Sequence, residues 1–314
     1  MTASVMVLSP GVQTTVQDLG RWGFQSLGIP VAGPMDPFAH RLANALVGNP
    51  RAAATLEAAM VGPTLQFDES RVIAVTGAMF DLHLDDQLAP MNTPLAVRPG
   101  SVLRFGERRS GARAYLAMAG GVDTTPVLGS RSTHVPTRMG GFEGRALRRG
   151  DRLAIGPASV ARMPPRGRGG DVPVAPSPAI VRVLAGPQAN RFVPEALEAF
   201  ASAPYHVSVH SDRMGVRLTG PTLRHIETAD IVSDATPVGS VQVPASGEPI
   251  VLMADRQTTG GYAKLATVIA ADIGVLGQAC PGDRIQFTVC EHREAIAALL
   301  GRERQLLALE QEPA

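Results

Sequence analysis

The sequence predicts a mainly β protein with a few helices, folded as two domains. The chain has 314 residues, which is too long for one ordinary hydrophobic core and suits two domains of about 150 residues each. Its 33 glycines and 26 prolines divide the apolar residues into short runs. Short strands separated by such turn formers are typical of barrels and sandwiches.

Four apolar runs are predicted to be strands, because each is short and is bounded by turn-forming residues. These runs are residues 72–75 (VIAV), 114–118 (AYLAM), 180–184 (IVRVL) and 249–253 (PIVLM). We expect strands of the same length as the runs, four to six residues.

Three segments are predicted to be helices. The first begins at Asp36, which suits an N-cap, has Pro37 at its first helical position and stops at Gly48. A second, short helix covers about residues 194–200. The last covers about residues 291–309 and is expected to cover a barrel end or a partner, because it has an apolar stripe of Ile296, Leu299, Leu300, Leu306 and Leu307.

A linker is predicted between the two domains. The stretch from residue 157 to 178 is rich in proline, glycine and arginine and contains no aromatic residue. We therefore place the first domain at residues 1–160, the linker at 161–178 and the second domain, with the terminal helix, at 179–314.

The two halves also resemble each other weakly. The sequence GPTL at residues 62–65 recurs at 220–223, and GDRL at residues 150–153 recurs as GDRI at 282–285. Residues 99–103 (PGSVL) are a further copy of the second element. The copies keep their order along the chain, which predicts two related halves in which a turn followed by a strand is reused.

Composition excludes several function classes. The net charge is +1 and the arginines are spread along the chain, which gives no basis for a nucleic-acid partner. No signal peptide is visible and no run approaches 18 apolar residues, so we expect a cytoplasmic protein without a membrane span. Cys280 and Cys290 flank a predicted strand in no metal-binding spacing, and we expect reduced thiols.

Common catalytic motifs are absent from the sequence. It contains no G-x-x-x-x-G-K-[ST] loop, no G-x-S-x-G elbow and no H-E-x-x-H. It has no Cys/His zinc cluster, so no metal site is predicted. The seven histidines are scattered, and none is presented as a catalytic base.

All basic residues of the chain except one are arginines. Of the 29 basic residues, Lys264 is the single lysine, and it follows a run dense in hydroxyls and glycines. A lysine is a compact point charge with a tunable pKa, whereas an arginine is a planar fork that is always charged. Lys264 is therefore a site candidate. The alternative is that arginine dominates through codon bias and that Lys264 remains on a solvated face.

Four further stretches are unusually polar and glycine-rich: residues 13–36, 128–145, 211–215 and 255–264. Glycines let backbone N–H groups approach a ligand, and Arg offers a fork for carboxylate or phosphate. An Asp in such a stretch can act as a base. The alternative is structural: Asp18–Arg21 and Asp255–Arg256 would be ion pairs that pin loops, and Ser130 a turn-forming hydroxyl rather than a nucleophile.

These stretches resemble the signature blocks of one family, which contains the second subunit of allophanate hydrolase and the Kip proteins. It is often called the biotin-dependent carboxyltransferase family. The matching blocks are residues 14–21 (TTVQDLGR), 33–36 (GPMD), 129–132 (GSRS), 211–215 (SDRMG) and 254–262 (ADRQTTGGY). The resemblance covers nearly the whole chain, and one departure is Ala263, where the family often has proline.

The resemblance implies a fold, partners and an activity. The implied fold is two tandem cyclophilin-like β-barrel domains. Members of this length resemble a component of bacterial ATP-dependent 5-oxoprolinase, which opens 5-oxo-L-proline to L-glutamate. The partners would be a Kip-inhibitor-like protein (the B subunit) and a third protein (the A subunit) of the oxoprolinase. Because this chain has no P-loop, ATP with Mg²⁺ would be shared with those partners, and the chain alone would be inactive.

Two other functions remain open. The chain could be the carboxyltransferase component of a biotin-dependent urea or amide carboxylase. It would then need a separate biotinylated carrier, because no biotinylation sequence surrounds Lys264 and no biotin is expected on this chain. It could also be a non-catalytic protein that antagonises a Kip-type kinase inhibitor. The signature blocks belong to the whole family and do not separate these functions.

The predicted site residues come from these blocks. The predicted catalytic residues are Asp18, Asp255, Arg256 and Lys264. The predicted substrate-binding residues are Arg21, Gln25, Ser130, Arg131, Arg213, Gln257, Thr258, Thr259, Gly260, Gly261 and Tyr262. The cations would bind phosphate and carboxylate, and the hydroxyls and glycine amides would donate to a developing oxyanion.

Overall fold

The computed structural model describes residues 3–158 and 178–311, which divide into two compact units. The described part of the first unit is residues 3–21, 32–158 and 304–311, and that of the second is 22–31 and 178–303. The predicted linker, residues 161–178, lies outside the described residues apart from Pro178. Among the helices that the structure describes, none is long and apolar enough to cross a membrane.

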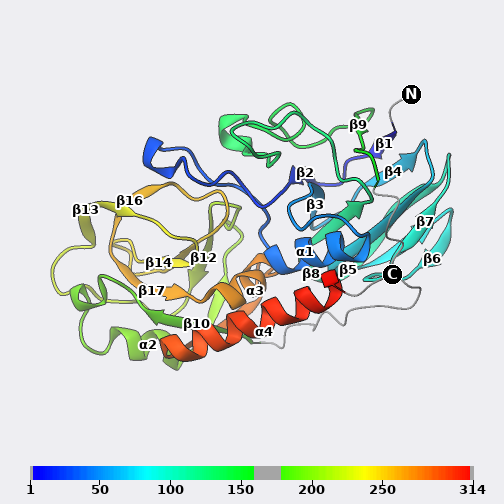
Figure 1. The fold of residues 1–314 in the computed structure, drawn as a ribbon. Coiled ribbons are helices and arrows are strands. Elements are labelled where there is room, and N and C mark those ends of the chain that lie inside the picture. The colour runs from blue at the N-terminus through cyan, green and yellow to red at the C-terminus, as the bar shows by residue number, and fades with distance from the viewer. Residues whose placement is uncertain (1–2, 159–177, 312–314) are drawn as a thin grey trace. The chain divides into compact units, whose positions relative to one another are not determined.

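The prediction of a mainly β protein with a few helices is confirmed (Figure 1). The strands of the first unit are β1 (Ser4–Ser9), β2 (Gln13–Gln17), β3 (Thr55–Ala59), β4 (Thr64–Phe67), β5 (Arg71–Leu84), β6 (Gln87–Ala89), β7 (Leu95–Val97), β8 (Val102–Met118) and β9 (Arg152–Ala154). They form one nine-stranded sheet along the path β2-β3-β8-β4-β1-β9. In addition, β5 pairs with β6, β7 and β8.

The strands of the second unit form a closed barrel and a two-stranded sheet. They are β10 (Ala179–Ala185), β11 (Tyr205–Val207), β12 (Gly215–Thr219), β13 (Asp230–Ala235), β14 (Ser240–Gln242), β15 (Ile250–Leu252), β16 (Thr259–Tyr262), β17 (Lys264–Val268) and β18 (Arg284–Val289). The barrel order is β10-β17-β14-β15-β12-β11-β18, and the parallel pair β10–β18 closes it. The two-stranded sheet is β13–β16.

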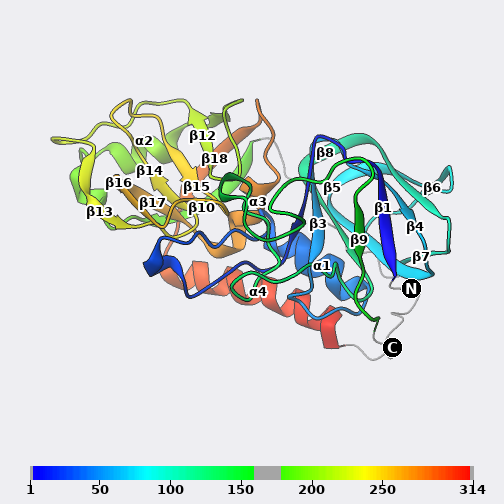
Figure 2. The same ribbon diagram turned by 90° about the horizontal axis from the view of Figure 1, so that it is seen from above.

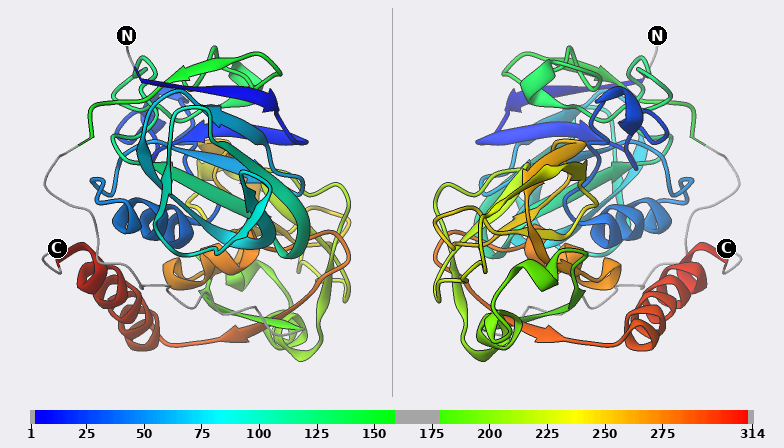
Figure 3. Two further views of the ribbon diagram at one scale, coloured as in Figure 1. Left: turned by 90° about the vertical axis from the view of Figure 1, so that its right-hand side faces the viewer. Right: turned by 90° about the vertical axis from the view of Figure 1, so that its left-hand side faces the viewer.

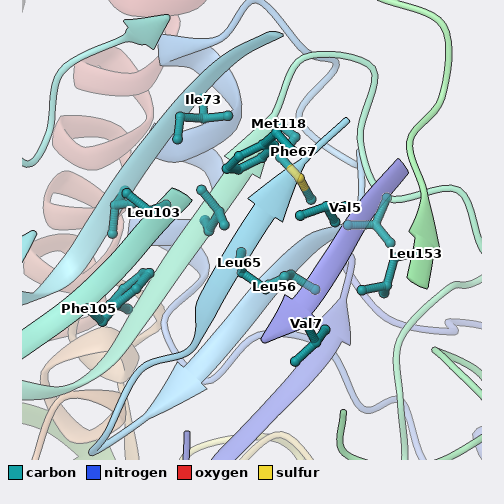
Figure 4. Close-up of a cluster of buried hydrophobic side chains, with 14 of the residues drawn as sticks. Val5, Val7, Leu56, Leu65, Phe67, Ile73, Leu103, Phe105, Met118 and Leu153 are labelled. Atoms are coloured by element: carbon teal, nitrogen blue, oxygen red, sulfur yellow. The ribbon is translucent and has the colours of Figure 1, made fainter. Parts of the chain in front are cut away.

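The core of the first unit lies on one face of its sheet. In β1, the buried Val5 and Val7 alternate with the half-buried Met6, which is the period-two pattern of a strand with one covered face. Figure 4 shows Val5 and Val7 beside buried side chains from other strands of the sheet. These neighbours include Leu56, Leu65, Phe67, Ile73, Leu103, Phe105, Met118 and Leu153.

Helix α1 (Pro37–Leu46) covers the opposite face of β5 and β8 (Figure 2). It begins as predicted: Asp36 is the N-cap, and its side chain accepts a hydrogen bond of 3.1 Å from the Ala39 N–H. Leu42 and Leu46 pack in a cluster that contains Tyr115 of β8. Local capping residues and an apolar face together explain this helix.

Three more helices lie in or extend from the second unit: α2 (Ala196–Ser202), α3 (Ile273–Gly277) and α4 (His292–Gln311). Helix α4 follows β18 directly along the chain (Figure 3). The predicted apolar stripe of α4 is divided in the structure, because only Leu306 is buried, in the cluster of α1. The other members of the stripe, Ile296, Leu299, Leu300 and Leu307, are exposed. The short α3 was not predicted.

The predicted strand length of four to six residues is wrong for all four runs: β10 has 7 residues and β15 has 3, and β5 and β8 differ most. Strands β5 and β8 have 14 and 17 residues and pair along most of their length. Only their apolar parts are visible as runs in the sequence, because charged residues such as Arg104 and Glu107 continue β8 beyond the core. Register shifts near Gly77, Met79 and Phe80 interrupt the pairing, as bulges that bend long strands do.

The predicted reuse of a turn followed by a strand is confirmed. In all three copies a glycine adopts a left-handed conformation, and a strand begins two residues later. These glycines are Gly100, Gly150 and Gly282, with φ of 87°, 90° and 90°. The side chain after each glycine accepts from the backbone N–H three residues before it: Ser101 from Arg98 (3.1 Å), Asp151 from Arg148 (2.7 Å) and Asp283 from Cys280 (2.8 Å).

Candidate functional site

In the first unit, Asp18 joins the first two predicted blocks. Its Oδ1 accepts hydrogen bonds from Ser130 Oγ (2.6 Å) and Ser132 Oγ (2.7 Å), and its Oδ2 accepts from the Arg131 N–H. The Gly20 N–H donates to Oδ1 at 2.9 Å. Residues more than a hundred positions apart are therefore organised around one buried carboxylate.

Arg21 and two glycines complete this polar cluster. Arg21 is buried and donates from Nη2 to the Ser132 carbonyl. Gly140 and Gly141 have φ of 67° and 58°, and a Cβ atom on Gly141 would lie 1.8 Å from Thr133 Oγ1. The close approach explains why glycine stands at this position.

Two residues that were predicted to bind substrate, Arg131 and Gln25, form hydrogen bonds with nearby residues of the chain instead. Arg131 donates from Nε to the Thr124 carbonyl (2.8 Å) and from Nη2 to Asp123 Oδ1 (2.9 Å). Gln25 lies in the segment that belongs to the second unit, where its Oε1 accepts from the Gly23 N–H at 2.8 Å. Both side chains stabilise local chain turns in the structure.

In the second unit, Arg213 and Asp255 form a buried bidentate ion pair. Both hydrogen bonds, from Nε to Oδ2 and from Nη2 to Oδ1, are 2.9 Å long. The structural alternative that paired Asp255 with its neighbour Arg256 is therefore wrong, since the partner of Asp255 is Arg213. This pair holds the end of β15 against the turn at residues 211–215, because Asp255 N also donates to the Arg213 carbonyl (2.8 Å).

Arg256 is buried without a carboxylate. It donates from Nε to the Thr236 carbonyl (2.7 Å) and from Nη1 to the Met253 carbonyl (3.2 Å). Among residues 3–158 and 178–311, no carboxylate oxygen lies within 4.0 Å of its guanidinium. Burial lowers the pKa of Arg256, because removal from water disfavours the charged form.

Lys264 is buried at the start of β17, so the alternative that it lies on a solvated face is wrong. Its Nζ donates to Asp234 Oδ2 (2.6 Å) and to the Ala235 carbonyl (3.0 Å). Gln188 Nε2 donates to the same Asp234 oxygen at 3.2 Å. The hydrogen bond from Lys264 holds the pKa of the Asp234 carboxyl below its usual range.

The glycine-rich block of the second unit forms β16. Gly260 pairs with Asp234 of β13, and Tyr262 pairs with Asp230. Thr258 precedes the strand, and its carbonyl accepts from the Thr236 N–H at 3.1 Å. Tyr262 lines an open cavity of about 730 Å³ together with Asp212 and Arg217. The block therefore presents backbone and side chains at the surface of a small sheet.

Sequence reasoning missed four polar residues of this region: Gln188, Asp234, Thr236 and Gln242. Gln242 is buried on β14, and its Oε1 accepts from Gln257 Nε2 at 3.4 Å. Thr236 Oγ1 donates to the Gln257 carbonyl. The sequence did offer one indication of Gln242: it is a glutamine between two valines, Val241 and Val243, in an apolar segment, where a buried polar side chain is unusual.

Two of the predicted site cations, Arg213 and Lys264, are paired with carboxylates of the same unit. The fork of Arg213 is held by Asp255 and the ammonium of Lys264 by Asp234, so these cations are already neutralised. In the part of the chain that the structure describes, no group of three or more His, Cys, Asp and Glu side chains is arranged to hold a metal ion.

Comparison with known families tests the family resemblance that was predicted from the signature blocks of the sequence. The family described as "Carboxyltransferase domain, subdomain A and B" matches residues 27–289. The chain belongs to this carboxyltransferase-domain family.

Two relatives place the chain within the carboxyltransferase-domain family. It is 39% identical over 298 residues to the C subunit of 5-oxoprolinase from Escherichia coli (strain K12), and the alignment covers 95% of each protein. It is 34% identical over 311 residues to urea amidolyase of Lachancea kluyveri, covering 92% of this chain but 17% of that protein.

A solved structure shares the fold of this family member. The crystal structure of K. lactis urea amidolyase matches 99% of this chain with a TM-score of 0.89 and 32% identity. The chain spans 20% of the length of that protein. The resemblance seen in the signature blocks is therefore confirmed for family and fold.

Proposed function

We propose that this chain is a subunit of an ATP-dependent 5-oxoprolinase that opens 5-oxo-L-proline to L-glutamate. One observation carries the proposal: the alignment with a protein named as the C subunit of 5-oxoprolinase covers 95% of both chains. In the urea amidolyase of Lachancea kluyveri, the matching region is 17% of a much longer chain. The coverage of nearly the whole E. coli protein therefore supports the oxoprolinase proposal.

The part of the reaction assigned to this chain is recognition of the lactam. Opening the ring breaks the C–N bond: a water oxygen adds to the carbonyl carbon, and the nitrogen leaves as the amine of glutamate. Arg256 offers positive charge and the Gln257 amide offers a donor close to β16. Such preorganised donors stabilise negative charge that develops on an oxygen.

The partners complete the proposed enzyme. They are the Kip-inhibitor-like B subunit, together with the A subunit as the third component. Because Arg213 and Lys264 are neutralised by their own carboxylates, ATP and Mg²⁺ are assigned to sites that the partners form or share. The chain alone is accordingly proposed to be inactive, and the complete enzyme to act in the cytoplasm.

Reconstitution tests this proposal. The chain is purified alone and together with its two proposed partners, and glutamate released from 5-oxoproline is measured with and without ATP. We expect release only from the complete complex and only with ATP. Omission of each component in turn is the control. Turnover by this chain alone, or an assembled complex without ATP-dependent release, would contradict the proposal.

A second candidate function is carboxyl transfer from carboxybiotin to a urea-like amine. The family description and the similarity to urea amidolyase favour it. It requires a biotinylated carrier, so a streptavidin blot of the purified complex and ATP-dependent incorporation of labelled bicarbonate are the measurements. A biotinyl protein in the complex, together with incorporation into urea, would replace the first proposal with this one.

A further inference from the structure

The open cavity of the second unit is large enough for a small molecule. Its volume is about 730 Å³, within the range of about 300–1,000 Å³ that is typical of ligand pockets. It lies over the outer face of β12 and β15, which pair antiparallel (Figure 2). Its wall includes Asp212, Arg217, Glu248, Ile250 and Tyr262. Every residue of the wall belongs to the second unit, so this unit forms the cavity by itself.

Two opposite charges of the wall lie on the same face of the β12–β15 pair. Arg217 is paired with Ile250, and Glu248 precedes Ile250 by two residues. The pairing continues beyond the end of β15, because the Leu218 N–H donates to the Pro249 carbonyl at 3.0 Å. Residues two positions apart on an extended chain share a face, so Glu248 is the diagonal neighbour of Arg217 on the cavity side.

These two charges are not engaged with the protein. Among the described residues, no carboxylate oxygen lies within 4.0 Å of the Arg217 guanidinium, and no basic nitrogen lies within 4.0 Å of the Glu248 carboxylate. The backbone of Arg217, in contrast, is fixed: its N–H donates to Ser211 Oγ (3.0 Å), and its carbonyl accepts from the Ser208 N–H (2.9 Å). Two long side chains of opposite charge therefore project from a well-held wall beside open volume.

A third charge of the wall is the carboxylate of Asp212. Its Oδ1 accepts hydrogen bonds from the N–H groups of Met214 (2.8 Å) and Gly215 (3.1 Å). These bonds hold the turn that leads into β12. Within residues 3–158 and 178–311, Oδ2 receives no hydrogen bond, so the second oxygen of this carboxylate is available to a ligand.

The charges of the wall indicate the chemical class of the ligand. With the histidine of the wall counted as neutral, one guanidinium and two carboxylates line the cavity. A complementary ligand carries one carboxylate and two cationic groups, which is the charge pattern of a basic α-amino acid. The Tyr262 side chain adds an aromatic ring, whose face attracts cations.

We propose that this cavity binds a basic α-amino acid, such as L-arginine or L-lysine. Arg217 binds the α-carboxylate with its planar fork, and Glu248 binds the α-ammonium group. Asp212 and Tyr262 bind the cationic end of the ligand's side chain. The site goes beyond the proposed function and does not depend on it, because neither 5-oxoproline nor L-glutamate has this pattern of charges.

Calorimetry on the full-length chain tests the site with three probes. L-Arginine carries all three charges, agmatine lacks the carboxylate, and Nα-acetyl-L-arginine lacks the α-ammonium group. The wild type is expected to bind L-arginine about tenfold or more tightly than it binds either analogue, because each analogue loses one hydrogen-bonded charge contact.

Two variants connect each charge of the ligand with its contact. Arg217→Met should weaken binding of L-arginine about tenfold and remove the preference over agmatine, while the preference over Nα-acetyl-L-arginine remains. Glu248→Gln should weaken binding by a similar factor and remove only the preference over Nα-acetyl-L-arginine. The matched controls Arg284→Met and Glu227→Gln change exposed residues outside the wall and should bind like the wild type. Thermal melting confirms that each variant is folded.

Three results would overturn the site. They are a folded wild type that does not bind L-arginine, wild-type affinity in both Arg217→Met and Glu248→Gln, and equal affinities of the wild type for L-arginine and agmatine. Glutamate release by the reconstituted complex is a separate measurement. Failure of the amino-acid site leaves that result in place, and a complex without turnover leaves binding of L-arginine in place.

Discussion

Lys264 and Asp234 form an ion pair in which the cation is buried and the anion is half exposed. The Nζ–Oδ2 distance is 2.6 Å, and the two side chains are 2% and 48% exposed. The ammonium also donates to the Ala235 carbonyl, so the Lys264 side chain bonds two consecutive residues of β13. The position therefore requires a slender cation, which explains a lysine in a chain that otherwise uses arginine.

The size of this site predicts different effects for two substitutions of Lys264. Lys264→Arg places a larger, planar group in a packed position and is expected to lower the free energy of unfolding by about 1–3 kcal/mol. Lys264→Met keeps the volume and leaves Asp234 in contact with water, so it should be the more stable variant. Denaturant unfolding of both proteins provides the measurement. A Lys264→Arg protein as stable as the wild type would contradict the packing argument.

The ion pair between Asp255 and Arg213 predicts a large stability effect. Asp255→Asn leaves the buried guanidinium of Arg213 without its carboxylate, which costs about 3–5 kcal/mol of the free energy of unfolding. The double variant Asp255→Asn with Arg213→Met removes both charges and should recover part of that loss. A double-mutant cycle in denaturant measures the coupling. Additive losses would show that the two side chains act independently.

The parts of the fold that the sequence predicts are those determined by neighbouring residues. Helix α1 follows from Asp36 at its N-cap and Pro37 at its first position. The recurring turns follow from a glycine that adopts a positive φ before Asp or Ser. The lengths of β5 and β8 could not be predicted from the sequence. Their outer parts are stabilised by pairing with each other rather than by burial of an apolar run.

The candidate site was predictable as a set of blocks but not as a set of contacts. Asp18 bonds Ser130 across 112 residues, and Asp255 bonds Arg213 across 42, so neither partner is visible in local sequence. Gln242 lies outside every polar block, because a buried strand of the barrel brings it beside Gln257. Such partners are brought together by tertiary packing, so they cannot be predicted from a short-range sequence pattern.

The polar cluster around Asp18 predicts unequal effects for two glycine substitutions. Gly141 and Gly129 both have positive φ, of 58° and 77°. An added Cβ on Gly141 would meet Thr133 Oγ1 at 1.8 Å, whereas nothing lies within 4 Å of one on Gly129. Gly129→Ala is expected to cost about 1 kcal/mol of backbone strain, and Gly141→Ala considerably more. Thermal unfolding of both variants measures the difference, and equal melting temperatures would count against the packed cluster.

The buried His40 predicts a loss of stability in mild acid. Burial lowers the pKa of His40 from 6.5 to about 4, since its ring is removed from water. Its Nδ1 lies 2.9 Å from Thr55 Oγ1, and its Nε2 lies 3.4 Å from Asn44 Nδ2, partners that suit a neutral ring. Well above pH 6.5 the ring is neutral in both the folded and the unfolded state, and stability from this group is complete.

Below pH 6.5 the unfolded chain binds a proton at His40 that the folded chain does not accept until about pH 4. The free energy of unfolding should therefore fall across this window, by about 3 kcal/mol, and change no further from this group at lower pH. His40→Gln removes this part of the pH dependence, while the same change at the exposed His292 retains it. Denaturant unfolding from pH 7 to pH 4 compares the three proteins, and an NMR titration follows the His40 ring directly. A His40 ring that titrates in the folded protein near pH 6.5 would refute the prediction, because it would show that burial does not favour the neutral form.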